Sequence, residues 1–199
     1  MIDRFDGSIA GLGTAIGLRV VVGHWPRSPF GAFTDVMVEQ PDGHRVLLAP
    51  SRDVADFVAG IYRFDEIRLT PVHASVCGPR WGITAGPLQV TFDVGGRPPL
   101  GLLLRLMPRR LATARWWISA VDVVACRVLP GVRTRGSADG GHQEYYAALD
   151  LHRISSAAVS WEGDDQGTLA AVTPPVRFGF GSTPTDPSLV RVVTLVREM

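Results

Sequence analysis

The sequence predicts a mainly β protein of the α+β class. We expect an antiparallel β-barrel or half-barrel of about 8–10 strands, with inserted helices at about 51–62 and 100–129. Short segments of alternating or β-branched apolar residues follow one another along most of the chain. Turns rich in glycine and proline separate them. So many strands would leave exposed edges in a flat open sheet, and closing the sheet removes these edges.

The first quarter of the chain contains three predicted strands. Residues 1–16 hold three glycines and few periodic apolar positions, so we expect an extended lead-in that pairs with a sheet edge. The valine-rich segment 17–25 is a strand. Segments 32–40 and 44–50 form a hairpin, because Pro41-Asp42-Gly43 between them is a strong turn signal.

Residues 51–62 have the signals of a helix. Ser51 is a good N-cap, and Asp53 lies in the first turn, where the helix dipole favours a negative charge. Apolar residues follow at helical spacing, at Val54, Phe57, Val58 and Ile61. We expect this helix to cover an edge of the sheet with its apolar face.

The segments 65–76, 81–84 and 88–94 are predicted strands, the last with clean alternation of apolar and polar residues. Pro71 cannot donate to a ladder, so it places its strand at an edge or a bulge.

The longest apolar stretch is 98–130. Pro108 divides it, so we expect one helix over about 100–107 and a longer one over about 115–129. Charged residues in every window exclude a transmembrane span, namely Arg105, Arg109, Arg110, Arg115 and Asp122. The favoured interpretation is a helical pair that covers the barrel or closes one end. Contact with a membrane interface through Trp116 and Trp117, and a lid over an apolar pocket, stay open.

The C-terminal third begins with a glycine-rich loop at 131–143. The alternating segment 144–154 is interpreted as a strand, and 175–180 as a strand kinked at its glycines. Residues 189–196 are strongly β-branched and close the sheet.

Composition excludes several chemistries. The 199 residues, 46% of them hydrophobic, fit a single domain over 1–199. Lysine and asparagine are absent, which indicates a GC-rich bacterial genome and excludes Schiff-base, P-loop and general-base lysines. A net charge of +1 gives no general attraction to nucleic acid. Cys77 and Cys126 lie in no metal-binding spacing, and the N-terminus lacks a signal peptide, so we expect a cytoplasmic protein without a cofactor.

The candidate ligand-binding residues lie in loops and in the 98–130 segment. His24, Trp25 and Arg27 border a stiff proline-containing loop, which either forms a rim at a barrel mouth or merely turns the chain. Arg133 and Arg135 stand in the glycine-rich loop, where guanidinium groups would suit an anionic ligand. The alternative there is a solvated loop. Trp116 is added as a residue of the proposed lid.

The candidate catalytic residues are Asp35, His73, Tyr146, Asp150 and His152. Asp35 is unusual in the middle of a strand, and it either lines a polar barrel interior or, as we favour, faces water. Asp150 and His152 share one face of a strand. No HxH or HExxH spacing supports a metal site, and no GxSxG supports a serine nucleophile.

The plan of antiparallel strands with a helical insertion is similar to those of lipocalin-like barrels and of acetoacetate-decarboxylase-like barrels. No specific residues carry either resemblance. The decarboxylases use a catalytic lysine, which this chain lacks, so that activity is excluded. The segment Gly23-His24-Trp25 matches the GxW motif of lipocalins only in spacing. The sequence therefore assigns no family.

Three functional hypotheses follow. The first is a binding module for a small apolar or amphipathic molecule, with a barrel pocket covered by 98–130 and gated by Arg27, Arg133 or Arg135. The second is an enzyme that uses His, Asp and Tyr for acid–base chemistry without a cofactor. The third is a structural protein that oligomerises through the Trp116-Trp117 segment. No nucleic acid is expected as a partner, while peripheral membrane contact and a homodimer stay open.

Overall fold

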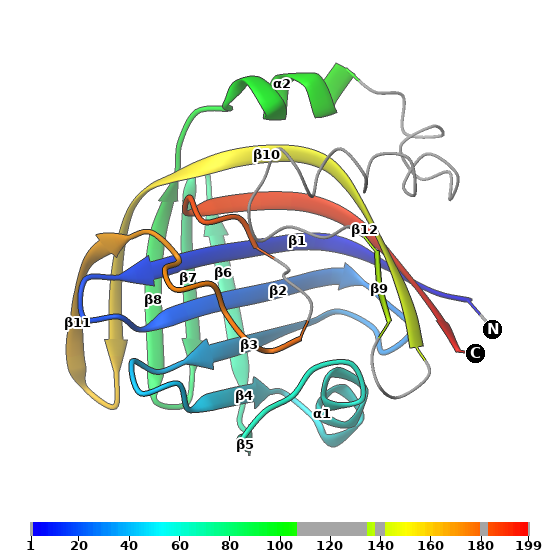
Figure 1. Cartoon of the computed structure of the whole chain (residues 1–199), viewed down its shortest axis with the longest axis horizontal. Helices are drawn as coiled ribbons and strands as arrows, with labels where there is room; N and C mark the ends of the chain where they lie inside the picture. Colours follow the sequence, from blue (N-terminus) through cyan, green and yellow to red (C-terminus); the bar gives the residue numbers. More distant parts are fainter. Residues whose placement is uncertain (1, 107–134, 138–141, 180–182, 199) are drawn as a thin grey trace.

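A computed structural model describes residues 2–106, 135–137, 142–179 and 183–198. The described chain is mainly β, and twelve strands belong to one sheet (Figure 1). The predicted antiparallel barrel with inserted helices is confirmed. The strand number exceeds the predicted range partly because the segment 65–76 forms two strands, and partly because the glycine-rich loop contains a three-residue strand.

The strands are, in chain order, β1 (Ile2–Thr14), β2 (Arg19–Arg27), β3 (Phe33–Glu39), β4 (Arg45–Ala49), β5 (Glu66–Leu69), β6 (Val72–Cys77), β7 (Arg80–Ala85), β8 (Leu88–Val94), β9 (Arg135–Ser137), β10 (His142–Trp161), β11 (Asp164–Ala170) and β12 (Ser188–Glu198). The helices are α1 (Arg52–Ala59) and α2 (Pro99–Leu106).

The sheet curls round on itself. Its strand order is β5-β4-β3-β2-β1-β11-β10-β8-β7-β6, and β12 pairs with both β1 and β10. The two strands at the ends of this order, β5 and β6, are separated in the chain only by Thr70 and Pro71. Because β3 also contacts β6, the strands enclose a common interior. Pro71 lies between these two end strands, so the prediction that it places its strand at an edge is confirmed.

The N-terminal segment is a central strand, and the prediction that it pairs with a sheet edge is wrong. β1 pairs with β2 along one side and with β12 and β11 along the other. Its glycines let neighbouring groups approach closely. A Cβ at Gly11, for example, would collide with the side chain of Thr183. The small residues that weakened the strand signal in the sequence are therefore explained by packing.

The helix predicted at 51–62 is confirmed as α1. The Ser51 hydroxyl accepts a hydrogen bond from the backbone N–H of Val54 at 3.3 Å, as an N-cap does. The second predicted helical region is only partly described: α2 covers Pro99–Leu106, and the expected helix over about 115–129 lies outside the described residues. Within the described ranges, no helix has the length and apolar character needed to cross a membrane.

Two hydrophobic clusters lie on opposite faces of the β1–β4 part of the sheet, because neighbouring residues of a strand point to opposite sides. Val20, Val22 and Val36 face the barrel interior and pack with residues of β7, β8 and β10. Val21 and Met37 face the other way and pack against α1 and the segment 172–178. We call this second side the α1 face.

The predicted strand at 175–180 is wrong, since the structure has no strand in 171–179. Pro174 and Pro175 lack the N–H that a ladder requires. The segment instead crosses the α1 face, in front of β1–β3 in Figure 1. Arg19 Nη1 donates to the carbonyl of Pro174 at 3.2 Å, and this bond helps to hold the segment on the sheet.

Candidate functional site

A small cavity lies between the α1 face of the sheet and α1, with a volume of about 40 Å³. Its described lining is mostly apolar, and its polar members are few. The sheet contributes Phe5, Ile9, Val21, Gly23, Trp25, Phe33, Asp35, Met37, Tyr146, Thr194 and Val196, and the helical side contributes Phe57, Val58, Ile61 and Tyr62. Among the described residues, α1 covers this cavity. The lid that we expected over 98–130 stays a prediction, because residues 107–130 lie outside the described residues.

Asp35 and Trp25 form the polar centre of the wall. Trp25 Nε1 donates to Asp35 Oδ1 at 3.0 Å. In the β2–β3 register, Gly23 lies opposite Asp35 and Phe33 lies opposite Trp25. A Cβ at Gly23 would come within 2.6 Å of the indole nitrogen and 2.5 Å of Oδ1, so the absence of a side chain there lets the indole reach the carboxyl group.

The Asp35 side chain is buried, with 4% of its surface exposed, so the favoured prediction that it faces water is wrong. The strand β3 is buried on both faces, because the barrel interior covers one and α1 covers the other. Burial raises the pKa of Asp35 to about 7, and the hydrogen bond from Trp25 opposes this shift only in part. A carboxyl group with that pKa exchanges protons near neutral pH.

Three further hydroxyl groups line the cavity. The Tyr62 hydroxyl is hydrogen-bonded to the Tyr146 hydroxyl, which joins the end of α1 to β10. Thr194 is 3% exposed, and its Oγ1 has no hydrogen-bond partner among the described residues. A buried hydroxyl without a hydrogen bond lowers the stability of a fold by about 1–3 kcal/mol. Thr194 Oγ1 could therefore gain a hydrogen bond from a ligand in the cavity.

Aromatic rings form the outer part of the site. Phe5 and Phe57 stack with centroids 5.0 Å apart, and Trp25 meets Phe5 edge-on at 5.8 Å. Phe30 packs on Phe57 at 5.1 Å and is 40% exposed. The aromatic cluster therefore extends from the buried carboxyl of Asp35 to solvent.

The other candidates from the 24–31 loop lie apart from the cavity. His24 faces the barrel side, where its Nδ1 is 2.8 Å from Thr34 Oγ1 and its ring meets Trp81 edge-on. Burial lowers the pKa of His24. Arg27 is exposed and lies 3.9 Å from Asp6. Of the loop candidates, only Trp25 lines the cavity.

Three of the catalytic candidates lie elsewhere. His73 is exposed on β6. Asp150 and His152 share a face of β10 as predicted, with His152 Nε2 3.5 Å from Asp150 Oδ2. Asp150 also binds Arg97 at 2.9 Å, and this guanidinium lowers the pKa of Asp150 against the opposing effect of burial. The described cavity lining includes none of these three. The structure thus brings together Asp35, Tyr146 and Trp25 of the sequence-based candidates.

The remaining candidates are described in part or not at all. Trp116 and Arg133 lie outside the described residues. Arg135 belongs to β9, where its backbone pairs with Tyr145. In the described part of the chain, no group of three His, Cys, Asp or Glu side chains is placed to hold a metal ion.

A second polar cluster is held by ion pairs, although the buried Arg19 Nε makes no hydrogen bond to the described residues. Glu39 is 0% exposed and lies 3.4 Å from Arg19 Nη2, which is buried opposite it in β2. Arg177 Nε donates to Glu39 Oε1 at 2.9 Å, and the Arg177 backbone N–H donates to Oε2 at 2.6 Å. Together with the bond from Arg19 to Pro174, these contacts attach the 171–179 segment to the α1 face.

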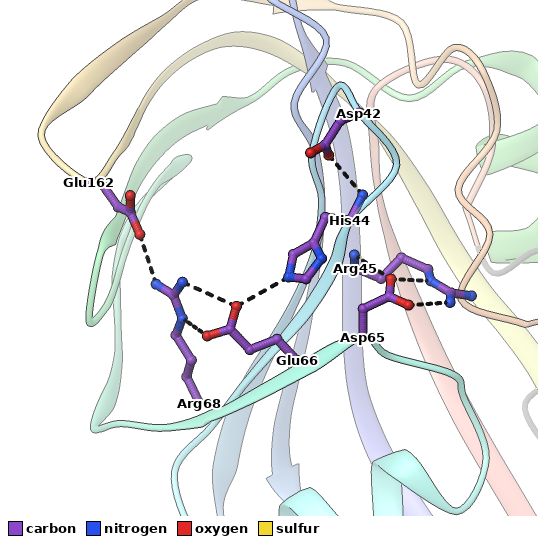
Figure 2. A network of polar contacts seen from close by, with 7 residues as sticks. All are labelled: Asp42, His44, Arg45, Asp65, Glu66, Arg68 and Glu162. Carbon is purple, nitrogen blue, oxygen red and sulfur yellow. Dashed lines mark hydrogen bonds and ion pairs between the residues drawn. The ribbon is translucent and has the colours of Figure 1, made fainter.

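A third polar network lies near the surface and joins strands that are distant in the sheet order (Figure 2). Glu66 on β5 contacts His44 Nε2 at 3.2 Å and Arg68 Nε at 2.6 Å. Arg68 also reaches Glu162, in the turn between β10 and β11, at 3.0 Å. Arg45 and Asp65 form a separate pair at 2.8 Å. These groups satisfy one another, so the network supports barrel closure and shows no sign of a binding site.

Sequence reasoning did not find Phe5, Phe57, Tyr62 or Thr194 as residues of one site. They come from β1, α1, the end of α1 and β12, which only the sheet order and the docking of α1 bring together. One signal was present: Phe57, Val58 and Ile61 form the apolar face of the predicted helix. That face was expected to plug or cover a sheet edge. The helix does contact β4 and β5 at one end of the strand order, and it also covers the cavity.

The fold and the cavity define a β-barrel protein with an aromatic-lined site outside the barrel interior. No family model matches the chain, and no curated protein matches it in sequence. It is similar to the solved structure of an acetoacetate decarboxylase from Legionella pneumophila, with 10% identity and a TM-score of 0.43 over 99% of this chain and 84% of that one. A putative AttH from Nitrosomonas europaea has 11% identity and a TM-score of 0.38, over 100% of this chain and 52% of that one. At such values, neither match assigns a family or a function.

Proposed function

We propose that this protein binds a small amphipathic molecule in the cavity beneath α1. The main support for this proposal is a mostly apolar cavity whose wall holds one buried carboxyl group, that of Asp35. Among the described residues, Trp25 is the only side chain that donates a hydrogen bond to this carboxyl group. Ligand sites commonly combine apolar walls with a few placed polar groups that fix orientation. The apolar part of the ligand would lie on the phenylalanine rings, and its polar end would meet Asp35.

The cavity limits the size of the buried group. A water molecule needs roughly 10–15 Å³ of such volume, so about 40 Å³ accommodates about three waters or a group of similar size. A larger ligand would keep its remaining atoms near Phe30 and Phe57, where the aromatic cluster reaches solvent. The proposal therefore concerns a small molecule, or the small end of a longer one.

The test is a screen of small alcohols, amines, phenols and carboxylic acids by thermal shift and by ligand-observed NMR on the full chain. A ligand at 100 times its Kd stabilises the folded state by about 2.7 kcal/mol. Val58→Phe would fill the cavity from α1 and abolish binding, because Val58 is 6% exposed at its wall.

Val76→Phe is the matched control, since Val76 is 53% exposed on β6 and is not in the described lining. It should bind like the wild type. The proposal is wrong if no compound binds the wild type, or if Val58→Phe folds and binds as tightly as the wild type.

One observation supports acid–base catalysis as a second candidate function. Asp35 and the Tyr62–Tyr146 hydroxyl pair line the same cavity, and the pKa of Asp35, raised to about 7 by burial, suits a general base at neutral pH. A panel of small ketones in D2O would test it by NMR detection of exchange at the carbon next to the carbonyl. Exchange that rises with pH through 7 and disappears in Asp35→Asn supports catalysis, and a rate equal to that of buffer alone excludes it for these ketones.

A further inference from the structure

The described wall of the cavity contains one carboxyl group and no basic side chain. Its titratable side chains are Asp35, Tyr62 and Tyr146, and arginine and histidine are absent from the described lining. Asp35 makes no ion pair among the described residues, and its contacts are the Trp25 indole and the backbone. A buried carboxylate normally has a paired cation. The described part of the chain does not supply one here.

The rest of the wall suits a cation better than it suits a neutral apolar group alone. Six aromatic side chains line the cavity, and ring faces attract organic ammonium ions. These are Phe5, Trp25, Phe33, Phe57, Tyr62 and Tyr146. The partnerless Thr194 Oγ1 can also accept an N–H from a ligand in the same cavity. Carboxylate, aromatic faces and a hydroxyl acceptor are together complementary to an ammonium group.

We propose that the ligand bound beneath α1 is a small organic ammonium ion, or the ammonium end of a longer amine, with Asp35 as its counter-ion and the aromatic rings as its cage. This inference rests on the proposed binding function and specifies its ligand class. The volume of about 40 Å³ holds a head group of about three or four non-hydrogen atoms. An alkylammonium ion carries its charge at neutral pH, so binding requires the ionised form of Asp35.

The experiment compares two probes of the same size, isopropylammonium chloride and 2-propanol, by isothermal titration calorimetry of the full chain. Potassium chloride at the same ionic strength controls for non-specific charge effects. Isopropylammonium should bind at least ten times more tightly than 2-propanol. Asp35→Asn should reduce its affinity at least tenfold and change the affinity for 2-propanol much less, because the amide keeps the shape of the side chain and can still hydrogen-bond a hydroxyl group but carries no charge.

A second measurement uses only the wild type, so it holds even if the variant does not fold. Asp35, with a pKa of about 7, is about half protonated at pH 7 in the free protein. Binding of a cation must therefore release about half a proton per ligand at pH 7 and nearly none at pH 9. Calorimetric titrations in two buffers with different ionisation enthalpies measure the number of protons released per bound ligand. The other polar groups of the described cavity lining are the Trp25 indole, which contacts Asp35, and the Tyr62, Tyr146 and Thr194 hydroxyls, and none of them is a cation.

The outcomes separate the two proposals. Equal affinity for the two probes, or binding of isopropylammonium without proton release at any pH between 5 and 9, overturns the ammonium inference and leaves the binding function standing. Failure of both probes, together with failure of the whole compound panel, overturns both. Tighter binding of isopropylammonium with proton release, and its loss in Asp35→Asn, supports both.

Discussion

Asp35 and Glu39 lie on the same face of the same strand, four residues apart, and both are buried, with 4% and 0% of their surfaces exposed. Their surroundings differ. Glu39 contacts the guanidinium groups of Arg19 and Arg177, and these contacts attach the 171–179 segment to the sheet. Asp35 receives a single indole N–H and borders a cavity. Burial alone therefore does not distinguish the two carboxyl groups, whereas the lack of a cationic partner among the described residues does.

The largest expected effect comes from removing the charge of Glu39, the carboxyl group that has cationic partners. Glu39→Gln leaves the buried Arg19 without its counter-ion, and breaking a buried ion pair from one side costs about 3–5 kcal/mol. We expect the free energy of unfolding in urea to fall by about that amount. Arg80→Gln, which breaks the exposed Arg80–Asp93 pair, is the control and should change it little. A small loss in Glu39→Gln would show that the cluster is not a structural clamp.

The next effect concerns Asp35, and here removing the charge should increase the stability of the fold. The pKa of Asp35 is raised from 3.8 to about 7, so the wild type loses stability as pH rises between these values. Asp35→Asn removes the ionisation and keeps an oxygen that accepts the Trp25 N–H. The variant should therefore gain up to about 4 kcal/mol over the wild type above pH 8 and lose this advantage near pH 4. Urea unfolding at both pH values measures it, and a difference independent of pH would contradict the assignment.

The smallest effect tests the unmet hydroxyl at the cavity wall. Thr194→Val replaces a buried hydroxyl without a partner by a methyl group of similar size, and we expect a gain of about 1 kcal/mol in the free energy of unfolding. Thr14→Val is the matched control. The Thr14 hydroxyl is also buried but donates to the Leu18 carbonyl and accepts from the Leu18 N–H, so the same substitution should destabilise. Loss of stability in both variants would show that Thr194 Oγ1 has a partner in solution.

The fold was predictable from the sequence where local chemistry decides it. Alternation identified β8, and the turn at 41–43 identified the hairpin of β3 and β4, where Gly43 adopts φ +93° and Asp42 accepts from the His44 N–H. Ser51 identified the start of α1. The prediction failed for β1, because its glycines carry no apolar pattern, and for the 171–179 segment, which contacts with Arg19 and Glu39 hold on the sheet.

The site was predictable only in part. Asp35, Trp25 and Tyr146 were recognised singly, from an unusual strand residue, a rim position and a candidate acid–base group. Their convergence depends on the β2–β3 register and on the position of β10 beside β12, which are not local properties. The burial of Asp35 was missed because it requires both faces of β3 to be covered, and only the docking of α1 covers the second face.

The absence of a side chain at Gly23 has a consequence for how relatives of this protein can be recognised. Because any larger residue there would displace the indole or the carboxyl group, a side chain at position 23 requires changes at residues 25 and 35. A homologue that retains the site should carry glycine, then tryptophan two positions later, then aspartate on the neighbouring strand. A homologue that has lost both the tryptophan and the aspartate can accept a side chain at the glycine position. This three-residue signature would trace the inheritance of the cavity in sequences too distant for overall similarity to be detected.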